Sequence, residues 1–164
     1  MPTPAFKRPE SVLVVVHTDD QVLLMERCSP EGFWQSVTGS LREDESPLDC
    51  AERELAEETG FAAGDLRDLG LTQRFPIAPE WRQRYAPGVA ENVEHAFALW
   101  LDATRPPTLN PEEHRAWRWM PAAAGDPGFG RHSQDYPGGH CGNRGDAASG
   151  ERGSSHAAAG IGVD

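Results

Sequence analysis

The chain has 164 residues, which is enough for one domain with a substantial core but too few for two comfortable domains. Its 26 acidic residues outnumber 15 Lys and Arg, and the formal net charge of -11 argues against a general nucleic-acid-binding surface. The three cysteines lack C-x-x-C spacing, which argues against a disulfide framework and a thiolate zinc site, and no apolar run reaches the roughly 18 residues of a membrane span. We therefore expect a cytoplasmic protein in which any anionic ligand is bound by local positive charge.

The N-terminal part of the chain predicts two neighbouring, well-buried strands at 11 to 17 and 21 to 27, because both stretches are almost continuously apolar. A loop containing Pro30 and Gly32 follows. The segment WQSVTG, 34 to 39, is expected to be a short extended piece that ends at its glycine. These elements indicate the beginning of a sheet.

A helix is predicted over 47 to 59. Pro47 suits a first helical turn, no Gly or further Pro interrupts the segment, and Gly60 stands where a left-handed cap would fall. Apolar residues recur at helical spacing and are expected to pack on the sheet: Leu48, Ala51 and Leu55.

Further strands are predicted at 66 to 75, at 93 to 101 and within 111 to 120. Composition then changes, because 11 of the 17 glycines fall in residues 122 to 164, where few apolar residues remain. We expect a folded domain over 6 to 121 and a disordered Gly/Ala-rich tail over 122 to 164. The abrupt loss of core residues suggests a shifted reading frame or a replaced terminus.

The helix carries an unusual concentration of acids. Glu54, Glu57 and Glu58 are three and four residues apart and project from one face, where like charges repel by about a few tenths of a kcal/mol per pair. Arg53 lies four residues before Glu57 and can neutralise part of this charge. One interpretation is a solvated acidic surface, and the other is a site where carboxylates converge on a hard divalent cation.

The stretch GSLREDESPLDCAERELAEETGF resembles the full signature of the Nudix hydrolases, G-x5-E-x7-R-E-U-x-E-E-x-G-U, in which U is apolar. The resemblance implies an α/β protein with a Nudix-type α/β/α sandwich around a mixed β-sheet, its C-terminal helix here missing or altered. By position it implies metal ligands at Glu54, Glu57 and Glu58. Glu45 and Arg53 match the pair that braces the catalytic loop.

Members of this family cleave a nucleoside diphosphate linked to another group by attack of water on phosphorus. The resemblance implies Mg²⁺ as cofactor, with Mn²⁺ as a possible substitute, to draw charge from the phosphate oxygens. A carboxylate then serves as the base, and both Glu57 and Glu113 are candidates.

Four further fragments resemble one Nudix subfamily, the bacterial dihydroneopterin triphosphate pyrophosphatases of folate biosynthesis: FKRP, FWQSVTGS, RYAPGV and EEHRAWRW. By position they imply substrate contacts at Lys7, Arg27 and Thr38, and a further metal ligand at Glu113. Without the resemblance, Lys7 and Arg27 would be read as solvated surface charges and Thr38 as an ordinary strand residue. A triphosphate nevertheless needs cations, and Arg offers a forked set of donors.

We therefore expect a pyrophosphohydrolase that converts dihydroneopterin triphosphate to the monophosphate and pyrophosphate. Its partner is a small-molecule triphosphate, with no nucleic acid or membrane, and the oligomeric state is left open. The alternatives are a pyrophosphohydrolase of dATP or other nucleoside triphosphates, a non-catalytic nucleotide-binding module, and an inert product of the altered terminus. Trp34 and Phe75 could stack on a flat ring; His95 is expected to be structural, and the role of His114 stays open.

Overall fold

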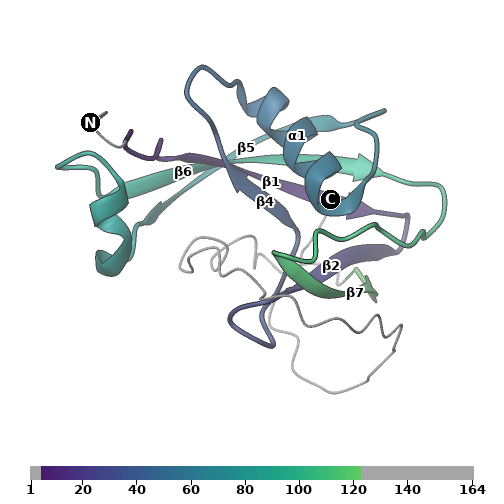
Figure 1. Ribbon diagram of the computed structural model, residues 1–164. Helices are drawn as coiled ribbons and strands as arrows, with labels where there is room; N and C mark the ends of the chain where they lie inside the picture. The colour runs from purple at the N-terminus through teal and green to yellow at the C-terminus, as the bar shows by residue number, and fades with distance from the viewer. Residues whose placement is uncertain (1–4, 123–164) are drawn as a thin grey trace.

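The computed structural model describes residues 5–122, which form one seven-stranded mixed sheet with an α-helix on one face (Figure 1). The elements in chain order are β1 (Glu10–His17), β2 (Gln21–Arg27), β3 (Trp34–Gln35), β4 (Val37–Ser40), α1 (Pro47–Thr59), β5 (Arg67–Pro76), the 3-10 helix η1 (Pro79–Arg84), β6 (Glu91–Trp100) and β7 (His114–Pro121). The predicted mixed sheet with a packed helix is confirmed. The predicted tail and the C-terminal helix position lie outside the described residues, apart from residue 122.

Strand β1 is the centre of the sheet and divides it. One edge of β1 pairs in parallel with β6 along its whole length, from Glu10 opposite Val93 to His17 opposite Trp100. On the other edge, its first half pairs antiparallel with β4, whereas His17 at its end pairs with Val22 of β2. Strands β3 and β7 then pair with β2, so that β2 and β7 diverge from the β1–β6 pair (Figure 1).

Helix α1 begins and ends where the sequence predicts. The Ser46 hydroxyl accepts a hydrogen bond from the backbone N–H of Asp49 at 3.1 Å, and Pro47 occupies the first turn. Gly60 ends the helix in the left-handed conformation with φ 73°, and its N–H donates to the carbonyl of Ala56. Both ends are therefore fixed by local chemistry.

The helix buries two adjacent rows of residues spaced four apart. One row contains Ala51 and Leu55, which are fully buried as predicted, and the other begins at the buried Cys50. The prediction for Leu48 is wrong, because this side chain is 45% exposed. Leu48 belongs to a third row, which continues with Glu52 and Ala56 and faces solvent.

The core lies between α1 and the sheet, and a smaller apolar cluster occupies the opposite face. Val15, Val22 and Leu24 form this second cluster, with Trp34 packed against it. The Arg118 guanidinium lies 4.0 Å from the centre of the Trp34 ring. Stacking of Trp34 or Phe75 on a substrate ring stays a prediction. Within residues 5–122, no helix has the length and apolar character needed to cross a membrane.

Candidate active site

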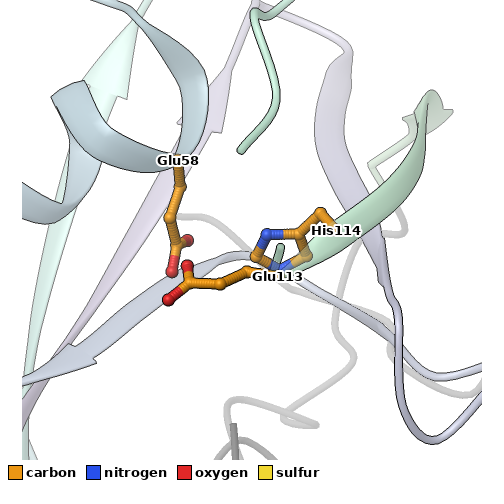
Figure 2. A group of neighbouring side chains, drawn as sticks. All are labelled: Glu58, Glu113 and His114. Carbon is orange, nitrogen blue, oxygen red and sulfur yellow. The ribbon is translucent and has the colours of Figure 1, made fainter. Parts of the chain in front are cut away.

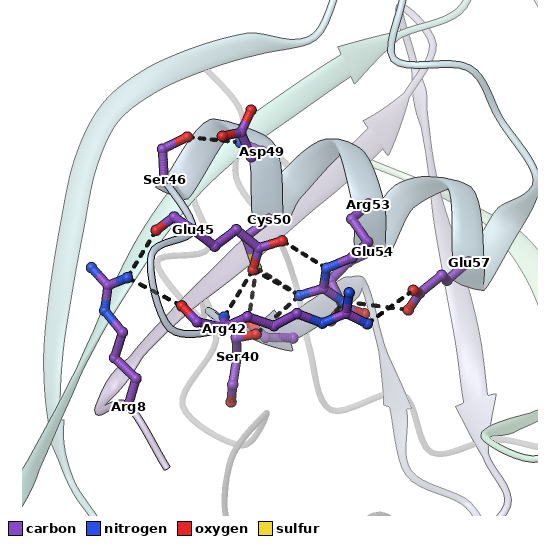
Figure 3. A network of polar contacts seen from close by, with 11 residues as sticks. Arg8, Ser40, Arg42, Glu45, Ser46, Asp49, Cys50, Arg53, Glu54 and Glu57 are labelled. Atoms are coloured by element: carbon purple, nitrogen blue, oxygen red, sulfur yellow. Dashed lines mark hydrogen bonds and ion pairs between the residues drawn. The ribbon is translucent and has the colours of Figure 1, made fainter. Parts of the chain in front are cut away.

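Arg53 holds together the loop that precedes α1 (Figure 3). Its Nε donates to Glu45 Oε1 at 2.7 Å and its Nη2 donates to Glu45 Oε2 at 2.9 Å. Nη1 donates to Glu54 Oε1 at 2.7 Å, and Nη2 also reaches the Ser40 carbonyl at 3.2 Å. One guanidinium therefore joins the end of β4, the loop and the helix, a geometry that a lysine could not reproduce.

The bracing pair predicts a measurable effect on acid stability. Hydrogen bonds from Arg53 hold the pKa of the Glu45 carboxyl at about 2, below its ordinary value of 4.5. A depressed carboxyl pKa stabilises the fold above 4.5, and this stabilisation is lost as the pH falls towards 2. We expect Glu45→Gln to lower the free energy of unfolding by roughly 2 kcal/mol at neutral pH.

Denaturant unfolding across pH checks this prediction, with Glu43→Gln in the same loop as the control because Glu43 is exposed. The gap between Glu45→Gln and wild type should narrow as the pH falls from 4.5 towards 2. A gap that is absent at neutral pH, or equal to that of Glu43→Gln, would contradict the bracing role.

The end of β4 comes unusually close to the helix. A Cβ atom placed on Gly39 would collide with the carboxyl group of Glu54, so only glycine leaves room for this side chain. One residue earlier, the backbone N–H of Thr38 donates to Glu58 Oε2 at 3.3 Å. The Thr38 hydroxyl instead donates to the Val12 carbonyl at 2.9 Å, inside the sheet. Strand β4 thus places both helix carboxylates, while a substrate contact through Thr38 stays a prediction.

Glu54 and Glu58 are buried carboxyl groups with raised pKa values. Desolvation raises the pKa of Glu54 to about 7, although Arg53 opposes the shift. Glu58 is 3% exposed, and burial followed by the charges of Glu54 and Glu113 raises its pKa well above 4.5. Like charges that are buried close to one another are stabilised when a cation binds between them.

Glu113 and His114, at the start of β7, come to the same place from a distant part of the chain. Ligand atoms of Glu58, Glu113 and His114 all lie within 4.8 Å of one another, and Figure 2 shows the two carboxylates and the ring converging. His114 is 2% exposed, and burial together with Arg27 lowers its pKa to about 4. Its ring is therefore neutral at neutral pH.

Glu57 occupies a different position from the other helix acids. Its side chain is 47% exposed and lies 3.4 Å from Arg53 Nη1 and 3.7 Å from Arg42 Nη2. Glu58 and Glu113 have ligand atoms within 4.8 Å of each other and Glu54 acts electrostatically on Glu58, whereas Glu57 lies across the Arg53 guanidinium from Glu45 (Figure 3). Its assignment as a ligand or base stays a prediction.

Both predicted substrate-contacting cations, Lys7 and Arg27, interact electrostatically with acids of the site. Arg27 ends β2, donates through Nε to the Ser29 carbonyl at 3.1 Å, and acts electrostatically on both Glu58 and His114. The Lys7 backbone N–H donates to the Arg84 carbonyl at 2.7 Å. Although the residue is exposed overall, desolvation of the ammonium group and then Arg84 lower the pKa of Lys7, whereas Glu54 raises it. The site therefore combines an acidic centre with a cationic margin.

The residues present fit a divalent cation. Glu58 is almost completely buried, and within residues 5–122 the Nδ1 atom of His114 is buried without a hydrogen-bond partner. Carboxylate oxygens are the donors that hard divalent ions take, and a bound cation would offset the desolvation that raises the pKa values of Glu54 and Glu58.

Removing divalent metal should make the thermal stability of the protein depend on pH. A carboxyl pKa raised in the folded state means that the native protein binds more protons than the unfolded chain, so stability falls as pH rises from 4.5 to about 7 through Glu54. We expect the melting temperature in EDTA to be lower at about pH 8 than at about pH 5, and added divalent metal to raise it most at the higher pH. Glu54→Gln should reduce this pH dependence. A melting temperature in EDTA that rises across this range, or that is unchanged by metal, would contradict the prediction.

A NUDIX domain family model matches residues 7–138. The chain belongs to the Nudix hydrolase family, whose members use divalent metal and act on phosphate compounds. Among its relatives is dihydroneopterin triphosphate diphosphatase of Escherichia coli, 40% identical over 125 residues that cover 73% of this chain and 82% of that protein. The protein of the same name from Haemophilus influenzae is 37% identical over 123 residues, covering 71% and 77% respectively.

The solved structure of the Escherichia coli dihydroneopterin triphosphate pyrophosphohydrolase matches the fold with a TM-score of 0.64 at 40% identity. The match covers 72% of this chain and 84% of that chain. The predicted family, fold class and enzyme class are therefore confirmed.

Two residues of the site were not identified from sequence. The sequence leaves the role of His114 open, and no pattern in it points to Gln35, whose amide lies 3.1 Å from His114 Nε2. The available signal was the position of His114 directly after Glu113 at the start of a strand. His95, predicted to be structural, bonds through Nε2 to Glu10 Oε2 at 3.0 Å.

Proposed function

We propose that this Nudix hydrolase converts dihydroneopterin triphosphate to dihydroneopterin monophosphate and pyrophosphate with Mg²⁺ as its cofactor. The single observation that carries the proposal is the convergence of Glu58 and Glu113 beside Glu54, in a chain 40% identical to a dihydroneopterin triphosphate diphosphatase. The group of acids supports a divalent-metal site, and the relatives support the pterin triphosphate as substrate.

In this proposal, different residues bind the metal and the substrate. Glu54, Glu58 and Glu113 would hold the cation, with Glu57 able to join them from the exposed side. A divalent ion bound there supplies positive charge to the phosphate oxygens and acidifies water. Mn²⁺ has the same charge and accepts the same oxygen ligands, so it should substitute for Mg²⁺.

Arg27 and Lys7 are proposed to bind the phosphate chain. Arg27 presents a planar fork for phosphate oxygens, and Lys7 adds a point charge next to Arg84. Lys7 interacts electrostatically with Glu54, and Arg27 with Glu58, which supports phosphate binding next to the acids. The proposed role of Arg53 and Glu45 is to fix the loop that carries the site, since their mutual hydrogen bonds occupy both side chains.

A general base must lie within hydrogen-bond reach of the attacking water, and burial disfavours the ionised carboxylate that takes the proton. The two candidates for the base, Glu57 and Glu113, are exposed, whereas Glu54 and Glu58 are buried. Ion pairs with Arg53 and Arg42 orient Glu57. The carboxylate of Glu113 lies within 4.8 Å of ligand atoms of the buried Glu58 and His114. Comparing Glu57→Gln with Glu113→Gln assigns the base, because its loss should abolish the acidic limb of the pH profile of kcat.

The test is a pyrophosphate-release assay on the full chain with Mg²⁺ and a panel of substrates. We expect the specificity constant for dihydroneopterin triphosphate to exceed those for dATP and the other nucleoside triphosphates. A higher value for a nucleotide would replace the pterin with that nucleotide. Tight ligand binding without any product, unchanged by Mg²⁺, would instead show a non-catalytic binding module.

A further inference from the structure

His114 is the feature of the site that the box carboxylates leave unexplained. The ring is 2% exposed, yet its Nδ1 atom has no hydrogen-bond partner within residues 5–122. The ring lies beside the carboxylates of Glu58 and Glu113, and one of its nitrogens is within 4.8 Å of a carboxylate oxygen of each (Figure 2). A buried polar atom without a partner is costly, so an unpartnered ring nitrogen beside a group of carboxylates requires an explanation.

We propose that His114 is a nitrogen ligand of the divalent metal, bound through Nδ1 together with carboxylate oxygens of Glu58 and Glu113. This inference rests on the proposed function in placing a metal at this site. It adds a ligand type that changes which ions the site prefers. Imidazole nitrogen suits transition metals, whereas Mg²⁺ favours oxygen, so the site should bind Mn²⁺ or Zn²⁺ in preference to Mg²⁺.

The spacing of the three donors is compatible with one ion after a small contraction. Donors about 2.1 Å from an ion are about 3.0 Å apart when neighbouring and about 4.2 Å apart when opposite. One ligand atom from each of Glu58, Glu113 and His114 lies within 4.8 Å of the other two. The adjustment can come from Glu113, an exposed residue with a flexible side chain.

Gln35 holds the other side of the ring. Its amide lies 3.1 Å from Nε2 of His114, and its second polar atom is buried without a partner among residues 5–122. Amide oxygen and nitrogen occupy equivalent places, so a half-turn of the amide lets Oε1 accept the Nε2–H of the ring. The proton then resides on Nε2 and the lone pair of Nδ1 faces the metal, the arrangement that metal-binding histidines commonly show.

Pulsed electron paramagnetic resonance of Mn²⁺ bound to the full chain tests the proposal without measuring hydrolysis. We expect nitrogen hyperfine coupling in wild type, its loss in His114→Gln, and its retention in the control His95→Gln. Absence of the coupling in wild type, or its persistence in a folded His114→Gln, would overturn the proposal. His114→Gln should also weaken Mn²⁺ binding by at least about tenfold and affect Mg²⁺ less, because glutamine supplies an oxygen.

A second measurement needs no variant. In wild-type protein with isotopically labelled histidine, Zn²⁺ should shift the nuclear resonance of one ring at Nδ1 while its Nε2 stays protonated. Binding through Nε2, or no shifted ring, would overturn the proposal. A failed pterin assay with intact nitrogen coupling would reject the proposed substrate alone, so the two failures are distinguishable.

Discussion

Replacement of Glu58 by Gln is expected to slow turnover by about two orders of magnitude or more, while the protein stays folded. Glu58 is 3% exposed and its Oε2 accepts the N–H of Thr38, so glutamine can fill the same space and keep an oxygen there. The substitution removes a negative charge from the proposed metal site. It also removes a carboxyl whose charged form is disfavoured by burial, so stability in EDTA should be unchanged or higher.

Steady-state kinetics with Mg²⁺ titration and thermal unfolding in EDTA check this expectation. Glu52→Gln is the matched control, because Glu52 lies on the same helix and is exposed. Both variants lose one negative charge, so a general electrostatic effect would appear in both. Turnover of Glu58→Gln within a few-fold of Glu52→Gln would remove Glu58 from the metal site.

Replacement of Gly39 by Ala is expected to reduce turnover by about a hundredfold. The added methyl group would occupy the place of the Glu54 carboxyl, which must then move away from Arg53 and from the rest of the site. Because the displaced group is the end of a flexible side chain, the loss of stability should be small. Activity should therefore fall much more than stability.

Gly70→Ala provides the opposite case. A Cβ at Gly70 meets no atom within 4 Å, but the residue has φ 65°, which strains any other side chain. This control should lose about 1 kcal/mol of stability and keep its turnover. Parallel measurement of melting temperature and kcat separates the two effects. Equal losses of activity in both variants would contradict the close-approach explanation for Gly39.

Local chemistry made α1 and most strands predictable. Pro47 and Gly60 mark the two ends of the helix, and the β-branched run of β1 and the apolar run of β2 leave little alternative to strands. Leu48 shows the limit of this reasoning. Its spacing is that of a residue on the apolar face. The packing of α1 instead buries two other rows of residues, which include Glu54 and Glu58.

The arrangement of the site depends on contacts that no local pattern contains. The division of β1 between β4 and β2 is set by pairing across the sheet, and it leaves β4 in contact with the carboxylates of α1. The contact between Gln35 and His114 joins positions 79 residues apart. The box motif singles out Glu54, Glu57 and Glu58 as candidates, but the contrast between buried Glu58 and exposed Glu57 follows from the packing of α1.

Anomalous diffraction from crystals of the full chain soaked in Mn²⁺ tests most directly whether these acids form a metal centre. We predict an anomalous peak within coordination distance of the Glu58 and Glu113 carboxylates, with Glu54 adjacent, and its disappearance in Glu58→Gln. Well-ordered crystals in which Mn²⁺ is absent from this cluster, with the three glutamates turned away from one another, would contradict the proposed catalytic site.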